Sequence, residues 1–282
     1  MSRRPLALAA LALVSAAAAA TVWLVALGVP RGRALDASAL EAFVGVARAP
    51  LSPSINGVAH LADPAPLLLG GLVLVAIALW RRRPMLALAV PAILLGANAT
   101  TQFLKPALAD VRLIELHHVE SIYPGSWPSG HATAAMSLAL CAVLVVGPQL
   151  RPLVALLGAG YAVAVGYALV VISWHLPSDV LGGYLVAATF TLAGAAAVAA
   201  LEARDPARRA ATASLTPALI GPPALAAIGA TLVAGGALAV IAQAPGMTLS
   251  ALEHPSGIVA GLGIAALGLA LTAGLAVALR SS

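Results

Sequence analysis

The chain has 282 residues, of which 61% are hydrophobic and 9% charged, and its formal net charge is +5. A soluble domain carries about 25% charged residues, so this composition excludes an ordinary water-soluble protein. A transmembrane β-barrel is excluded as well, because its strands would alternate apolar and polar residues, and this chain does not. The sequence therefore predicts an all-α, polytopic membrane helical bundle.

About 20 apolar residues cross the hydrocarbon core of a bilayer as a helix. The sequence predicts eight such spans, at residues 6–29, 64–80, 85–104, 130–147, 152–173, 177–201, 218–243 and 256–279. The first span follows Arg3 and Arg4, as the apolar region of a signal peptide would. Its apolar run is longer than the roughly 7–15 residues of a signal peptide, and we interpret it as a retained helix.

Between the first two spans, residues 36–50 predict an amphipathic helix. Ser38 and Glu41 have the spacing of a capping box, which marks the start of a helix. The apolar stripe of this helix consists of Leu40, Phe43, Val44 and Ala47. Two arrangements remain open at this stage, a helix lying on the membrane and a helix packed against the bundle.

Two cations follow the third span. Lys105 is the only lysine of the chain, and Arg112 lies seven residues beyond it. A lone cation at a helix end can extend its charge to the membrane surface, but the pair could also neutralise an anion. In the same loop, His117, His118 and Glu120 could bind zinc. Two exposed loop histidines are the simpler interpretation, and we predict no metal site.

The fourth span begins with Trp127-Pro128-Ser129-Gly130-His131. Ser129 is a favourable N-cap, and Gly130 allows a ligand to approach the backbone closely. The free N–H groups and the dipole at a helix start attract negative charge. This segment therefore predicts an anion site with a histidine beside it.

The sixth span begins after Ser173-Trp174-His175-Leu176-Pro177-Ser178-Asp179. His175 and Asp179 are four residues apart, so a helical turn would place them on one face. A carboxylate bonded to one imidazole nitrogen leaves the other nitrogen as a base or nucleophile. Ser129 with His175 could also form the nucleophile and base of an intramembrane serine protease. That alternative gives Lys105 and Asp179 no role.

The remainder of the chain carries few chemical signals. Residues 202–217 predict a polar linker, and two spans follow in residues 218–282. Gly257 and Gly261 have the G-x-x-x-G spacing that brings membrane helices together, which suggests a homodimer through these spans. The single cysteine, Cys141, falls within a span and is interpreted as a small core residue.

The distribution of charge predicts the orientation, because cytoplasmic loops are enriched in Lys and Arg. With both termini in the cytoplasm, the inner segments hold ten of the fifteen basic residues: Arg3, Arg4, Arg81, Arg82, Arg83, Arg151, Arg204, Arg208, Arg209 and Arg280. The positive charge thus reflects orientation and requires no nucleic-acid partner. All six histidines fall at the opposite, extracytoplasmic face, and Trp127 and Trp174 suit the depth of its interface.

The three polar segments resemble the motifs of the type 2 phosphatidic acid phosphatase superfamily, which read K-x6-R-P, P-S-G-H and S-R-x5-H-x3-D. Their counterparts here are Lys105 with Arg112, residues 128–131, and His175 with Asp179. The resemblance covers about residues 1–200. It implies a six-span phosphatase core, residues 1–201, followed by a cytoplasmic linker, residues 202–217, and a two-span extension, residues 218–282.

The resemblance also implies a metal-independent, cofactor-free hydrolysis of a lipid phosphate in two steps. His175 would attack phosphorus with Asp179 orienting it, and His131 would protonate the leaving oxygen. The phosphoryl group would be held by Lys105, Arg112, Ser129 and Gly130. The substrate would be a polyprenyl phosphate or diphosphate, or a glycerophospholipid phosphate, whose tail stays in the bilayer.

Two of the three motifs depart from the family pattern. Leu113 replaces the proline of the first motif, and Ala168 and Leu169 replace the Ser-Arg pair of the third. The missing arginine would otherwise contact phosphate. Its possible substitutes are Arg31, Arg33, Arg48, His117 and His118. A non-catalytic lipid-phosphate-binding relative, or a phosphotransferase with the same site, therefore remains as an alternative.

Overall fold

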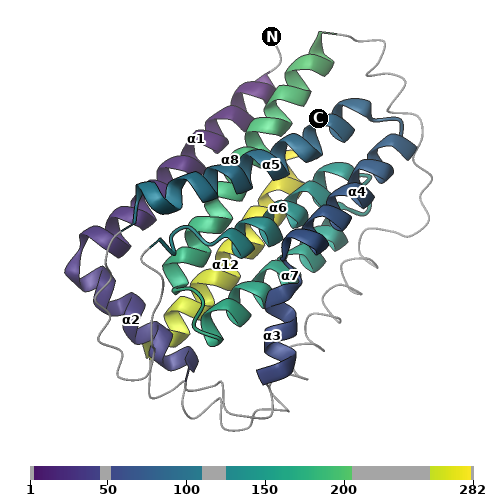
Figure 1. Cartoon of the computed structure of the whole chain (residues 1–282). Coiled ribbons are helices and arrows are strands. Elements are labelled where there is room, and N and C mark those ends of the chain that lie inside the picture. Colours follow the sequence, from purple (N-terminus) through teal and green to yellow (C-terminus); the bar gives the residue numbers. More distant parts are fainter. Residues whose placement is uncertain (1–2, 45–51, 110–124, 205–254, 281–282) are drawn as a thin grey trace.

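The computed structural model describes residues 3–44, 52–109, 125–204 and 255–280. Every regular element in this part of the chain is a helix. The elements are α1 (Arg3–Trp23), the π-helical segment η1 (Leu24–Gly28), α2 (Pro30–Val44), α3 (Ser52–His60), α4 (Pro64–Trp80), α5 (Pro84–Ala107), α6 (Gly130–Val145), α7 (Arg151–Val171), α8 (Pro177–Ala203) and α12 (Pro255–Ala278). Figure 1 shows them as one elongated bundle.

The predicted membrane helices are present throughout the described residues. Five helices are long and apolar enough to cross a bilayer: α1 continued by η1, α5, α7, α8 and α12. The pair α3 and α4, bent by 55° at residues 61–63, would supply a sixth. The helix of the fourth predicted span, α6, is apolar but has only 16 residues. The predicted span at 218–243 and most of the linker lie outside the described residues.

Proline marks the start of most of these helices. It stands within the first two positions of α4, α5, α7 and α8, where its missing N–H group costs no intrahelical hydrogen bond. The sequence therefore fixes these helix starts well, and they agree with the predicted spans to within one residue.

The short helix α6 is the centre of the bundle. It packs against α4, α5, α7, α8 and α12, and twelve of its sixteen residues are buried. Small residues such as Ala134, Ala135 and Ala139 cover its surface and allow close approach of its neighbours. Side chains from the surrounding helices can therefore meet at one end of this central helix.

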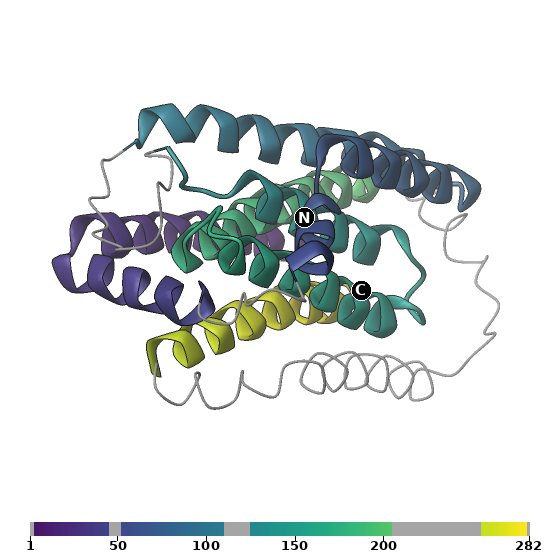
Figure 2. The same cartoon turned by 60° about the horizontal axis from the view of Figure 1, so that its bottom comes forward.

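The last helix, α12, packs on the bundle beside α2 and α7 (Figure 2). A Cβ atom on Gly257 would lie 2.4 Å from that of Ala42 on α2. The Tyr167 hydroxyl of α7 donates to the Gly261 carbonyl at 2.6 Å. The G-x-x-x-G spacing thus serves packing within the chain, and the homodimer stays an untested prediction.

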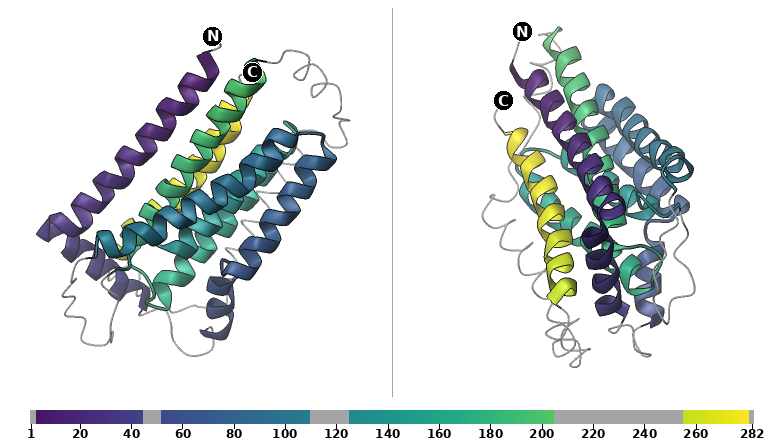
Figure 3. Two further views of the ribbon diagram at one scale, coloured as in Figure 1. Left: turned by 45° about the horizontal axis from the view of Figure 1, so that its top comes forward. Right: turned by 90° about the vertical axis from the view of Figure 1, so that its left-hand side faces the viewer.

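The two ends of the bundle differ in chemistry. The start of α1 and the ends of α8 and α12 lie at one end, which Figure 3 shows from two sides. There Arg83 pairs with Glu202 at 2.6 Å, and Arg151 donates to the Leu279 carbonyl at 2.9 Å. The opposite end holds α2, α3, the end of α5 and the starts of α6 and α8. The described histidines, His60, His131 and His175, belong to these elements and to the turn before α8.

One local prediction is wrong. The helix expected from residue 36 begins at Pro30, so Ser38 lies inside α2 and cannot cap it. The Ser38 hydroxyl instead donates to the Leu35 carbonyl at 3.1 Å. Proline at the first position starts the helix earlier than the capping-box pattern indicated. The apolar stripe is confirmed where it is described, because Leu40 is fully buried and Phe43 packs against the core.

Candidate active site

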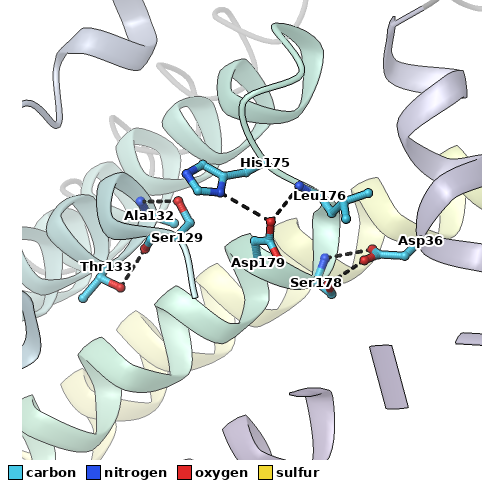
Figure 4. Close-up of polar contacts among 8 residues, drawn as sticks. All are labelled: Asp36, Ser129, Ala132, Thr133, His175, Leu176, Ser178 and Asp179. Carbon is cyan, nitrogen blue, oxygen red and sulfur yellow. Dashed lines mark hydrogen bonds and ion pairs between the residues drawn. The ribbon is translucent and has the colours of Figure 1, made fainter. Parts of the chain in front are cut away.

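His175 and Asp179 are brought together by the turn that joins α7 to α8. The N–H groups of Trp174 and His175 both donate to the Leu169 carbonyl, which closes the end of α7. Asp179, in the first turn of α8, accepts from the Leu176 N–H group at 3.0 Å and faces His175 Nδ1 at 3.4 Å (Figure 4). Both side chains are buried. Because a carboxylate only accepts, His175 Nδ1 carries the proton and Nε2 keeps its lone pair.

The start of α6 lies directly against this pair. The Ser129 hydroxyl accepts from the Ala132 N–H group at 3.3 Å, as an N-cap does. The Ser129 N–H group donates to the Asp179 carbonyl at 2.9 Å, which ties the second motif to the third. The next two N–H groups, of Gly130 and His131, have no carbonyl within α6 to bond. They are the donors that this helix start offers to an anion.

Lys105 reaches the same place from the last turn of α5. A Cβ atom on Gly130 would lie 3.8 Å from Lys105 Nζ and 3.3 Å from Gln102 Nε2. The Lys105 ammonium also interacts electrostatically with Asp179. A cation, an amide and free backbone donors therefore converge beside His175. The sequence interpretation missed Gln102, although its position three residues before Lys105 places it on the same helix face.

A second histidine–carboxylate contact holds His131. Its Nε2 atom lies 2.9 Å from Asp63 Oδ1, and the other Asp63 oxygen lies 2.9 Å from His60 Nδ1. The hydrogen bond with His131 lowers the pKa of the Asp63 carboxyl, so this group is a carboxylate at neutral pH. The sequence interpretation assigned Asp63 no role. It is 68 residues from His131, and no local spacing joins the two.

The tryptophans occupy two different environments. Trp174 is 40% exposed and its ring lies 5.5 Å from that of His131 and 5.3 Å from that of His60. Trp127 is 4% exposed, against the prediction of an interfacial side chain. Its indole packs on Gly182 of α8, which has no side chain to prevent the contact.

The outer helix α2 also reaches the site. Asp36 accepts from the N–H group of Ser178 at 3.0 Å and from its hydroxyl at 2.5 Å (Figure 4). Ser178 adjoins Asp179 at the start of α8, where a carboxylate is favoured by the free N–H groups and the helix dipole. Asp36 therefore fastens α2 to the segment that carries the third motif.

The position of the missing arginine is part of the core. Leu169 is fully buried, and Ala168 is 4% exposed. Among the proposed substitutes, Arg31 is exposed, and Arg33 donates to the Leu27 carbonyl of η1. Arg112, Arg48, His117 and His118 lie outside the described residues. Within the described part of the chain, no three His, Cys, Asp or Glu residues form a group that could hold a metal ion.

The fold and the site together define a helical membrane protein that brings two histidines and a lysine to the start of α6 at one end of its bundle. Residues 84–204 match the family model of the PAP2 superfamily, so this segment is similar to that superfamily. The matched segment contains Lys105, residues 128–131, and His175 with Asp179.

Comparison with solved structures gave a similar fold in the crystal structure of the first transmembrane PAP2 type phosphatidylglycerolphosphate phosphatase from Bacillus subtilis. The identity is 22% and the TM-score 0.48, and the match covers 72% of this chain and 98% of that one. A comparison with the sequences of curated proteins gave no match.

Proposed function

We propose that this protein is a membrane lipid phosphatase that acts through a phosphohistidine on His175. The arrangement of His175 and Asp179 beside the free N–H groups of Gly130 and His131 carries the proposal. Lys105 lies at the same helix start and would neutralise phosphoryl charge. Such a set supplies a nucleophile, an orienting carboxylate and charge stabilisation, which phosphoryl transfer requires.

In the first step, His175 Nε2 attacks phosphorus while the bond to the leaving oxygen breaks. His131 protonates that oxygen as its electron pair develops. In the second step, water attacks the phosphohistidine, passes a proton to His131, and releases phosphate. The Asp179 carboxylate stabilises the positive imidazole ring formed between the steps. Arg112, from the first motif, would add a second phosphate contact.

The proposed substrate is a phosphomonoester or diphosphate of a lipid, either a polyprenyl or a glycerophospholipid phosphate. The site lies at one end of a bundle of apolar helices, so an acyl or prenyl tail can stay in the bilayer while its head group reaches the site. From the distribution of arginines we propose that this end faces away from the cytoplasm.

The test is phosphate release by the purified protein from a panel of these lipids in detergent. His175→Ala should abolish release, because no nucleophile remains. Lys105→Gln should lower kcat/KM by roughly 10²-fold or more through lost charge stabilisation, and Lys105→Arg should recover part of it. The matched control is Arg82→Gln, which removes an exposed cation from the opposite end of the bundle and should leave release unchanged.

Two further measurements complete this test. An acid-labile phosphoryl adduct should form on the wild-type protein and not on His175→Ala. EDTA should leave release intact. Wild-type turnover by folded His175→Ala would refute the proposal, and loss of activity to EDTA that zinc restores would favour a metal enzyme.

A second candidate is a non-catalytic lipid-phosphate-binding protein. Leu169 favours it, because this buried side chain replaces the arginine that contacts phosphate in the family pattern. The same lipid panel separates the two candidates. Binding of a lipid phosphate without phosphate release or adduct formation would support the binding protein.

A further inference from the structure

Asp63 joins two histidines that come from different helices. It lies in the turn between α3 and α4, His60 ends α3, and His131 opens α6. Both carboxylate oxygens are used, each at 2.9 Å from one imidazole nitrogen. The exposed fraction of the side chains falls from 45% at His60 to 35% at Asp63 and 29% at His131. The three side chains thus form a row from the solvent-exposed surface to the site.

The chemistry of this contact fixes the state of His131. A carboxylate accepts hydrogen bonds and donates none, so the nitrogens that face Asp63, His60 Nδ1 and His131 Nε2, both carry protons. The His131 nitrogen that can exchange a proton with the substrate is then Nδ1. Trp174 packs against both imidazole rings, at 5.3 and 5.5 Å, and restricts their rotation.

We propose that Asp63 is a positioning residue that holds His131 in the tautomer required for proton transfer to and from the substrate. The proposal rests on the function proposed above and adds to it. No local sequence motif includes Asp63, and its role follows from the contact alone.

The proton balance of the two steps then runs through a single nitrogen. In the first, the proton on His131 Nδ1 moves to the leaving oxygen, while the electron pair of the broken P–O bond stays on that oxygen. In the second, a proton of the attacking water moves to Nδ1 as the bond between phosphorus and His175 Nε2 breaks. His131 thereby recovers its starting state. Throughout both steps, Nε2 keeps its own proton and donates it in a hydrogen bond to Asp63.

Burial has the largest influence on the protonation of His131, and the charged groups around it modify that influence. Asp63 stabilises the protonated ring, and the Lys105 ammonium opposes it electrostatically. Asp179, which interacts with Lys105 and His175, and Asp36, which binds Ser178, are further acids at this end. Removal of Asp63 therefore leaves His131 near the Lys105 ammonium without its direct counter-charge.

The first experiment is the pH dependence of kcat/KM for a lipid phosphate with Asp63→Asn. The alkaline limb, where His131 loses its proton, should move to lower pH by roughly 0.5–1 unit, and kcat should fall roughly tenfold or more with little change in KM. Asp63→Glu keeps the carboxylate and should bring the alkaline limb part of the way back to its wild-type pH. The control Glu41→Gln removes an exposed carboxylate from α2 and should leave the profile unchanged.

The second experiment changes the leaving group. The p-nitrophenolate ion needs no protonation to depart, whereas an alkoxide does. Asp63→Asn should therefore lower kcat/KM strongly for phosphatidic acid and by less than about threefold for p-nitrophenyl phosphate. A purely structural role of Asp63 would lower both equally.

The third measurement does not depend on turnover. Nitrogen NMR of ¹⁵N-histidine-labelled protein, with His131→Asn to assign the signal, should show His131 protonated on Nε2, and Asp63→Asn should lose this preference. An active wild-type protein with an unchanged alkaline limb in Asp63→Asn would overturn the inference and leave the phosphatase intact. Absence of phosphate release by the wild-type protein would overturn the phosphatase, whatever tautomer NMR shows.

Discussion

Two adjacent glycines, Gly182 and Gly183, let α8 approach the turn that begins α6. A Cβ atom on Gly183 would lie 2.7 Å from the Ser129 carbonyl oxygen and 3.0 Å from the Thr133 nitrogen, both backbone atoms. The backbone of a helix start cannot move aside as a flexible side chain can. These glycines therefore set how closely His175 and Asp179 stand to the N–H groups at the start of α6.

We predict that Gly183→Ala displaces the start of α6. Overpacking of this kind costs about 1–3 kcal/mol, more than the roughly 1 kcal/mol of helix propensity that alanine adds. The thermal unfolding midpoint in detergent should fall, and phosphate release should fall with it.

The control for this substitution is Gly274→Ala, at a helical glycine of α12 whose Cβ position has open space around it. It should leave the unfolding midpoint unchanged or raise it slightly. Equal midpoints for the two variants would contradict the role assigned to Gly183.

At the scale of elements, the contact between α2 and α8 decides the position of the outer helix. Asp36 binds both polar groups of Ser178, although 142 residues separate them. Bonds to an ionised acceptor are stronger than neutral ones, and the carboxylate also meets the positive end of the α8 dipole. Of the two arrangements left open by the sequence, the structure shows the packed one.

Asp36→Ala should lower the free energy of unfolding by about 1–3 kcal/mol, because the Ser178 donors lose a charged partner. Ser178→Ala should cost less, since the backbone N–H group remains. A double-mutant cycle on the thermal unfolding midpoint measures the coupling directly. The control Ser38→Ala removes a hydroxyl that bonds only within α2, and it should have little effect. Additive effects of Asp36→Ala and Ser178→Ala would show that the contact contributes nothing.

At the scale of the whole molecule, most of the described arginines lie at the end of the bundle opposite the described histidines, the exceptions being Arg31 and Arg33 of α2. Arg81 donates to the Val145 carbonyl at the end of α6, and Arg151 donates to the Leu279 carbonyl just beyond α12. Cations at helix C-termini are favoured by the helix dipole, so these contacts also stabilise the bundle. The separation agrees with the predicted orientation, which the arrangement of helices alone does not test.

Labelling of introduced cysteines tests that orientation. Cys141 is fully buried and should not react, so the wild-type protein serves as the background. Leu61→Cys, at an exposed position of the histidine end, should react with a membrane-impermeant maleimide in intact cells. Arg82→Cys, at the arginine end, should react only after permeabilisation. The reverse pattern would place the site in the cytoplasm and exclude the proposed orientation.

The sequence by itself determined the class of fold and much of the candidate site. Apolar runs and prolines predicted the helices, because both act locally: a span needs its own backbone hydrogen bonds, and proline is favoured in a first turn. The neighbours within each motif, such as His175 with Asp179, were predictable for the same reason. Their spacing of four residues is one turn of a helix.

Only the tertiary structure decided which separate segments meet. The contacts of Asp63 with His131, of Asp36 with Ser178 and of Gly183 with Ser129 join residues far apart along the chain. Such contacts depend on how the helices pack, and a local pattern of residue types carries no information about that packing. The packing also placed Leu169 in the core and Gln102 beside Gly130, so it decided which polar groups the site contains.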